Sequence, residues 1–201
     1  MATRSIESMD GACRGIHSAT RWRAHAHQHP LRHRLAVVGP DAADIVRHAG
    51  GWLFDRAAAG WEVTALVTAT DNAASLQILG ATVLDLRQSL AISRHDLWPT
   101  AVAVSVRSYL AEREVREGVL DCLDRGLAEV AIWGEDLPAE LAERVATSCH
   151  RVSVAAMAFK SCALAAAGFP GVSVPPVEPF RSGSLLPPAF REEMRDLVPL
   201  G

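Results

Sequence analysis

Residues 35–68 constrain the fold more than any other stretch of the chain, because two apolar runs flank one amphipathic segment. Leu35–Val38 is apolar throughout, which is typical of a strand covered on both faces. From Val46 to Ala57, apolar residues recur every three or four positions, as on one face of a helix. Gly60 ends this segment, and Glu62–Val67 begins a second strand. The stretch therefore predicts a β-α-β unit with parallel strands.

Similar patterns continue the α/β alternation to residue 168. Residues 98–110 are ambiguous, since they fit a strand or a helix, and Pro99 favours a helix. Val152–Ala167 is apolar nearly all round and predicts a buried helix. We expect a three-layer, Rossmann-like α/β domain over residues 35–168, with about four parallel strands. The further expected elements are strands at Thr82–Leu86 and Ala128–Trp133 and helices at Ala73–Leu79, Glu112–Arg125 and Glu135–Cys149.

The two flanks of this domain differ from it in composition. Residues 1–34 hold six arginines and five of the eight histidines, and they lack apolar periodicity, which predicts a disordered basic tail. His25, His27 and His29 alternate and could together bind Zn²⁺ or Ni²⁺ weakly, although a plain basic extension is favoured. Residues 169–201 predict a proline-rich extended arm with a short amphipathic helix at Pro188–Leu197.

Charge and cysteine spacing exclude several classes of protein. The net charge is −3, and because residues 1–34 contribute about +4, the remainder is acidic; we therefore expect no nucleic acid on the core. The four cysteines are far apart, which argues against a disulfide framework or a zinc ribbon. No apolar run is long enough to span a membrane, and no signal-peptide core is present. Nineteen of the twenty basic residues are arginine, typical of a GC-rich bacterial genome. We expect a cytoplasmic bacterial protein.

Candidate ligand-binding residues follow from the predicted sheet, because ligands of open parallel sheets bind beyond the carboxyl ends of the strands. Carboxylates gathered there favour a cation, or the hydroxyls of a ribose or sugar. Several have an equally plain structural role, since Asp41 can cap a helix and Glu135 can complement a helix dipole. The candidates are Gly39, Asp41, Asp44, Thr68, Asp71, Asp85, Gly134 and Glu135.

Well-known catalytic and cofactor motifs are absent from the sequence. The loop after the first strand is GPDAAD rather than G-x-G-x-x-G, and neither a P-loop nor a G-x-S-x-G elbow occurs. The sequence identifies no cofactor and no complete catalytic set. It therefore favours a non-catalytic module that binds a small molecule, and a scaffold or homodimer acting through the C-terminal arm is a further alternative.

Residues 35–70 also resemble the opening unit of the LmbE-like sugar N-deacetylases, which show a His-Pro-Asp-Asp metal loop, a Gly-Gly pair in the helix and a Gly-x-Glu-Val-Thr second strand. Pro40-Asp41, Gly50-Gly51 and residues 60–64 match this pattern. Gly39 stands in the position of the metal-binding histidine, and two extra residues separate Asp41 from Asp44. The resemblance implies either a metal-dependent hydrolase that uses Asp41 and Asp44, or a relative that has lost the metal centre.

Overall fold

The computed structural model describes residue 18 and residues 33–91 and 99–183. The expectations for His25, His27 and His29 and for the helix at Pro188–Leu197 lie outside these residues. The strands are β1 (Arg34–Asp41), β2 (Glu62–Ala69), β3 (Thr82–Asp85), β4 (Ala101–Ser105), β5 (Glu129–Trp133), β6 (Ala146–Arg151) and β7 (Val177–Gly183). The helices are α2 (Ala42–Ala58), α3 (Ala73–Ile78), α4 (Leu86–Leu90), α5 (Val106–Ala111), α6 (Arg113–Arg125), α7 (Ala139–Ala142) and α8 (Val154–Ala166).

All seven strands form one sheet in the order β3-β2-β1-β4-β5-β7-β6. The first five of these strands are parallel to one another, and β7 is antiparallel to both β5 and β6. The α/β prediction and the β-α-β unit at residues 35–68 are confirmed. The expected number of about four strands is wrong, because β6 and β7 lack the continuous apolar runs that identify covered strands and β4 was assigned to a helix.

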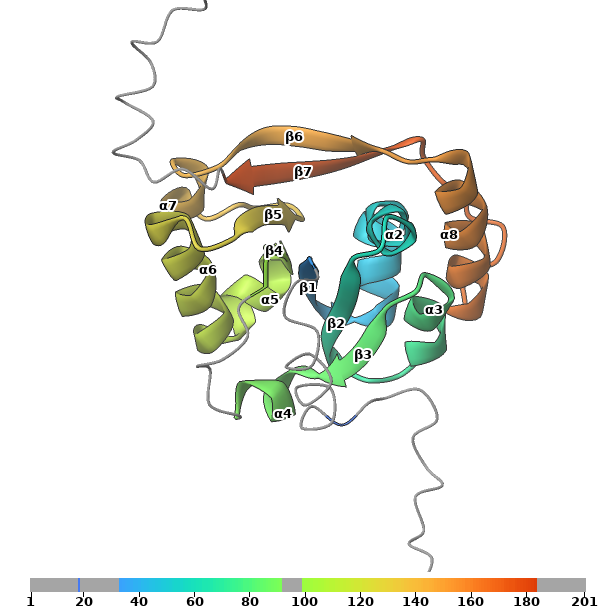
Figure 1. Cartoon of the computed structure of the whole chain (residues 1–201), viewed down its shortest axis with the longest axis horizontal. Helices are drawn as coiled ribbons and strands as arrows, with labels where there is room; N and C mark the ends of the chain where they lie inside the picture. Colours follow the sequence, from blue (N-terminus) through green and yellow to red (C-terminus); the bar gives the residue numbers. More distant parts are fainter. Residues whose placement is uncertain (1–17, 19–32, 92–98, 184–201) are drawn as a thin grey trace, which may run out of the picture.

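Two apolar cores make the fold three-layered (Figure 1). One core joins the sheet to α2, α3 and α8, and includes Ile45, Leu53 and Leu76, none of which is accessible to solvent. The other lies on the opposite face, where α5, α6 and α7 contribute side chains such as Tyr109 and Leu123. Because the sheet is covered on both faces, its central strands are buried throughout, as their sequences predict.

Three local predictions need correction. Residues 98–110 were expected to be helical, but Ala101–Ser105 is the strand β4 and only Val106–Ala111 is helical; β4 lies between β1 and β5, where alternating valines pack well. The helix expected at residues 135–149 is the short α7 followed by β6. The helix at residues 152–167 is present as α8, but it is not buried, since one face is exposed to solvent.

The predicted end of the α/β domain at residue 168 is also too early. Val177–Gly183, expected to belong to an extended arm, is the strand β7, which pairs with β5 on one side and β6 on the other. Pro179 is tolerated there because β5 pairs only with residues 181–183 of β7, which leaves one side of the strand unpaired at position 179. We call β6, α8 and β7 (residues 146–183) the C-terminal unit, and β1 to β5 with their helices the parallel unit.

A buried ion pair joins the two units. Lys160 of α8 donates to Glu178 of β7 at 2.5 Å, and each side chain is only 1% exposed. Glu178 also accepts from the backbone N–H groups of Gly51 and Trp52 in α2, both at 2.8 Å, while Lys160 donates to the Arg47 carbonyl at 2.7 Å. A buried charge is tolerated only when it is paired and hydrogen-bonded, and here both charges are.

This contact explains the Gly50-Gly51 pair. Two adjacent glycines in a helix can permit close packing or mark a break, and α2 is continuous through both residues. A Cβ added to Gly51 would lie 2.5 Å from Val152 Cγ1 and 3.1 Å from Glu178 Oε1. The glycine therefore lets the C-terminal unit approach the backbone of α2 closely enough for Glu178 to reach its N–H groups.

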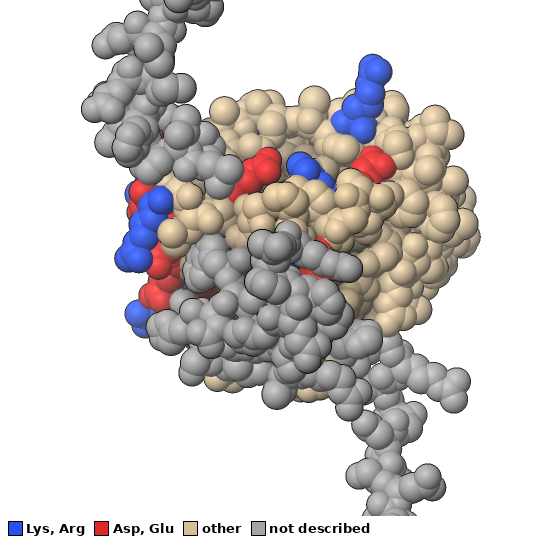
Figure 2. Space-filling model, viewed as in Figure 1, with Lys and Arg blue, Asp and Glu red and all other residues tan. Residues whose placement is uncertain are grey.

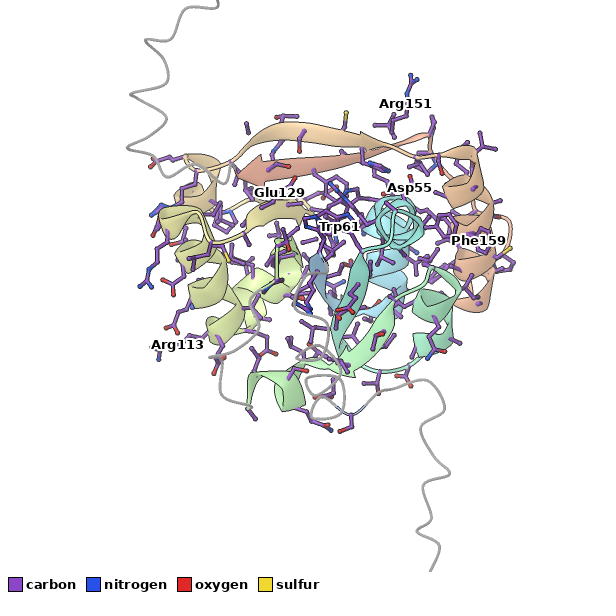
Figure 3. All side chains as sticks on the ribbon, in the orientation of Figure 1. Asp55, Trp61, Arg113, Glu129, Arg151 and Phe159 are labelled. Carbon is purple, nitrogen blue, oxygen red and sulfur yellow. The ribbon has the colours of Figure 1, made fainter. Side chains whose placement is uncertain are left out.

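A second polar contact lies where β6 turns into α8. Asp55 of α2, labelled in Figure 3, accepts from Ser153 Oγ at 2.6 Å and from the Ser153 backbone N–H at 3.1 Å. Its carboxylate also lies 2.7 Å from His150 Nε2. Burial raises the pKa of Asp55, but the hydrogen bonds from Ser153 and His150 outweigh this, so that its pKa is lower than the ordinary value. The ionised carboxylate thus fastens the start of α8 to α2.

Candidate functional site

The sheet has one topological switch point, between β1 and β4. From β1 the chain proceeds to β2 on one side, and β4 continues to β5 on the other. Loops that leave β1 and β4 therefore diverge at the carboxyl edge, which is where open α/β sheets bind their ligands. Asp41 ends β1 and Asp44 lies in the first turn of α2, while Arg107 lies in the first turn of α5, directly after β4.

Asp44 is the side chain on which the groups at this edge converge. Its Oδ2 accepts from the Trp133 indole N–H at 3.0 Å, which ties the first turn of α2 to the end of β5. Its Oδ1 lies 3.7 Å from an Arg107 guanidinium nitrogen and 3.6 Å from His48 Nδ1. Both of these distances exceed a hydrogen bond, so this oxygen keeps acceptor capacity. We call Asp44, His48, Arg107 and Trp133 the Asp44 cluster.

The members of this cluster differ in exposure. The Asp44 side chain is 10% exposed and Trp133 is buried, whereas the side chains of Arg107 and His48 are 70% and 41% exposed. His48 Nδ1 also lies 2.9 Å from the Asp44 carbonyl, which orients the ring on its own helix. A buried carboxylate beside an exposed guanidinium gives a site that presents both an acceptor and donors.

Asp41 has the structural role that its position suggests. Its carboxylate accepts from the Asp44 backbone N–H at 2.8 Å and caps α2. This hydrogen bond sets the direction of the first helical turn, and with it the position of the Asp44 side chain. Asp41 therefore supports the Asp44 cluster without belonging to it.

The other predicted residues are spread along the same edge. Asp85 caps α4 by accepting from the Gln88 backbone N–H at 2.8 Å. Thr68 lies in β2 and Asp71 in the following turn, toward the β3 side of the sheet and away from Trp133. Gly134 and Glu135 are exposed and directly follow Trp133. Among the candidates in the described residues, a hydrogen bond to a side chain joins only Asp41 and Asp44.

A metal centre of the kind implied by the LmbE-like resemblance does not fit these residues. Within the described ranges, no group of three or more His, Cys, Asp or Glu side chains could hold a metal ion. Gly39 occupies the histidine position, and a Cβ there would lie 2.5 Å from Ile45 Cγ1. A histidine could enter only if Ile45 moved, so the local packing is built for glycine.

Tyr109, near this edge on α5, is a structural donor rather than a base. Its hydroxyl donates to Glu140 at 2.6 Å. Burial and this hydrogen bond raise the pKa of Tyr109 above its ordinary value, so the phenol stays protonated at neutral pH. Neighbouring Ser108 has a buried hydroxyl without a hydrogen-bond partner, which marks an unmet polar group on the same helix.

Sequence reasoning did not select Arg107 or Trp133. Arg107 belonged to a segment expected to be one helix, so its place just after a strand was hidden. Trp133 closes a predicted strand and precedes Gly134, but its indole N–H gives no signal in a hydropathy pattern. Their common signal is position, because each lies at or just after the end of a parallel strand.

Comparisons with known proteins support the fold. No protein-family model matches the chain, and no curated protein matches it. Among solved structures, it is similar to GalB, the 4-carboxy-2-hydroxymuconate hydratase from Pseudomonas putida KT2440, with a TM-score of 0.51 and 14% identity over 77% of this chain and 97% of that one. It is also similar to a deacetylase of teicoplanin biosynthesis in complex with teicoplanin, with a TM-score of 0.50 and 13% identity over 75% and 98% of the two chains.

These neighbours are LmbE-like proteins, so the predicted resemblance is confirmed as a likeness of fold. Identities this low do not carry over an activity, because one fold hosts many functions. No helix formed by the described residues combines the length and apolar character needed to cross a membrane. The function therefore has to be argued from the Asp44 cluster itself.

Proposed function

We propose that this protein binds a hydroxyl-rich small molecule, such as a sugar or a nucleoside, at the Asp44 cluster. The observation that carries the proposal is the Asp44 carboxylate, which accepts from Trp133 through one oxygen while the other lies 3.6 Å from His48 and 3.7 Å from Arg107, beyond hydrogen-bond distance. Carboxylates held in this way accept hydrogen bonds from pairs of ligand hydroxyls. Arg107 supplies exposed donors on the other side of the switch point.

A direct test is calorimetric titration with a panel of monosaccharides, amino sugars and nucleosides. We expect one class to bind, and Asp44→Asn to weaken its binding by about 10–100-fold, because a charge-assisted hydrogen bond contributes about 1.5–3 kcal/mol. Asp71→Asn is the matched control, because Asp71 is exposed at the same sheet edge but toward the β3 side. Binding that is equal in Asp44→Asn and in the native chain would rule out this site.

The alternative is a metal-dependent hydrolase related to the LmbE-like deacetylases. The fold likeness favours it, and the donor set at Gly39 and Asp41 opposes it. Titration of the purified chain with Zn²⁺ separates the two, with Asp41→Ala as the comparison. Stoichiometric zinc binding that is lost in Asp41→Ala, together with hydrolysis of acetylated amino sugars, would establish the hydrolase and overturn the proposal.

A further inference from the structure

The exposed side of α8 and the segment that follows it carry no charge. Between residues 153 and 177, 20 residues are exposed or partly exposed, and none of them is Asp, Glu, Lys, Arg or His. Lys160 is the one charged residue of this range, and it is buried in the pair with Glu178. Figure 2 shows the consequence, since the side of the molecule where α8 lies is free of blue and red.

This surface is also the most apolar part of the described exterior. Of the six large hydrophobic side chains that are exposed in the described residues, four belong to it: Val154, Phe159, Val172 and Val177. Phe159 is 45% exposed and stacks on Phe54 of α2 with ring centroids 4.5 Å apart, which fixes its orientation. Apolar surface whose own residues carry no charge is characteristic of the centre of a protein interface. A charged group of α2 does contact these residues, since the Arg47 guanidinium lies 4.6 Å from the centre of the Phe169 ring.

The helix at its centre has the spacing of a packed helix pair. Ala155, Ala158, Cys162 and Ala165 are all exposed and lie at intervals of three, four and three residues. This is the a/d spacing of helices that pack against one another, and small side chains at these positions allow a close approach of the two backbones. The solvent-facing side of a helix usually carries charged or polar residues, and this exposed stripe has none that are charged.

We propose that this surface, residues 153–177, is the interface of a homodimer in which α8 packs against α8 of a second copy. Three features favour a second copy over a different partner. In a two-fold interface each residue near the axis meets its own equivalent, so any charge would face a like charge, and this surface has none. Its 20 residues also approach the roughly 20–30 residues that each side of a stable interface uses. Small side chains at the centre fit their own equivalents without a pocket.

The mass in solution tests the proposal. Sedimentation equilibrium of the full chain is expected to give twice 21.5 kDa. Ala158→Arg places a charge at the centre of the helix pair and is expected to raise the dimer dissociation constant about 100-fold or more. Ala111→Arg is the matched control: Ala111 is exposed at the end of α5, on the opposite face of the sheet, and its substitution should leave the dimer intact.

Thiol labelling provides a second measurement that does not depend on a substitution. Cys162 and Cys149 are both exposed in the single chain, on α8 and on β6 respectively. In the dimer, maleimide labelling of Cys162 should slow about tenfold as protein concentration rises, while labelling of Cys149 stays constant. A native chain that remains monomeric, whether or not it binds lipid vesicles, would overturn the proposal. So would a dimer that survives Ala158→Arg.

Discussion

The parallel unit and the C-terminal unit are stabilised in different ways. In the parallel unit, strands with continuous apolar sequences pack against helices through side chains such as Ile45 and Leu53. The C-terminal unit packs on the same core through Leu164 and Phe180, and it is held in addition by polar contacts. In these contacts Glu178 and Lys160 reach the backbone of α2, and Asp55 accepts from Ser153. The difference teaches that an apolar core is visible in a sequence, whereas a buried polar contact between distant residues is not.

Removing the buried ion pair should have the largest effect on stability. Glu178→Ala leaves Lys160 charged and buried, and it removes the acceptor for two backbone N–H groups of α2. We expect the free energy of unfolding to fall by about 3–5 kcal/mol, as measured by urea unfolding. The double substitution Lys160→Met/Glu178→Gln should recover part of this loss, because no uncompensated charge remains. A loss below about 1 kcal/mol in Glu178→Ala would show that the pair does not anchor the unit.

A truncation in the parallel unit should cost less. Ile132 of β5 is 1% exposed and belongs to the core on the α5, α6 and α7 face. Ile132→Ala should lower the free energy of unfolding by about 2–4 kcal/mol through lost burial and a residual cavity. Leu127→Ala is the control, because Leu127 is 43% exposed and should change little. Equal losses in the two variants would contradict the assigned core.

Filling the glycine contact should have an intermediate effect. The added methyl group in Gly51→Ala meets Val152 at 2.5 Å, so we expect a loss of about 1–3 kcal/mol from overpacking. Gly118→Ala provides the matched comparison, since nothing lies within 4 Å of a Cβ there and the residue is helical. That variant should gain about 0.5–1 kcal/mol. Thermal unfolding of both variants measures these changes in stability. A Gly51→Ala variant more stable than the native chain would refute the close approach of the two units.

The smallest effect should be one that depends on pH. Because the pKa of Asp55 is lower in the folded chain than its ordinary 3.8, the carboxylate stabilises the fold above that value and loses this contribution as the pH falls through the folded pKa. Asp55→Asn should therefore cost about 1–2 kcal/mol at neutral pH and make the acid limb of the stability curve shallower. Asp121→Asn, at an exposed site on α6, should leave the acid limb unchanged. A parallel shift of the whole curve in Asp55→Asn would contradict this reading.

The sequence predicted those parts of the parallel unit whose structure is determined by residues close together in the chain. Leu35–Val38 and Glu62–Val67 were identified as strands because continuous apolar character and a helical stripe between them leave few alternatives. The Asp41 cap was likewise readable, since an acidic side chain before a helical stripe satisfies free backbone N–H groups. The strand β4 was misread because its alternating valines also fit a helix and Pro99 favoured one.

The C-terminal unit escaped prediction for a different reason. Glu178 lies in a proline-rich stretch that resembles an arm, and its partners Gly51 and Trp52 are more than 120 residues earlier in the chain. Lys160 is the only lysine in the sequence and lies in an apolar helix, and nothing near it in the sequence indicates its ion pair with Glu178. The Asp44 cluster was likewise predicted only in part. Asp44 is predicted from its position after the first strand, whereas Trp133 and Arg107 can be assigned to the site only when the order of the strands is known.

Native-state hydrogen exchange of the native chain and of Glu178→Ala tests this two-unit account most directly. If Glu178 anchors the C-terminal unit, amides of β6, α8 and β7 should exchange faster in the variant, together with those of Gly51 and Trp52. Amides of β1, β2 and β4 should keep their protection, because their core does not involve Glu178. Uniform acceleration across all strands, or none in α8, would contradict the account.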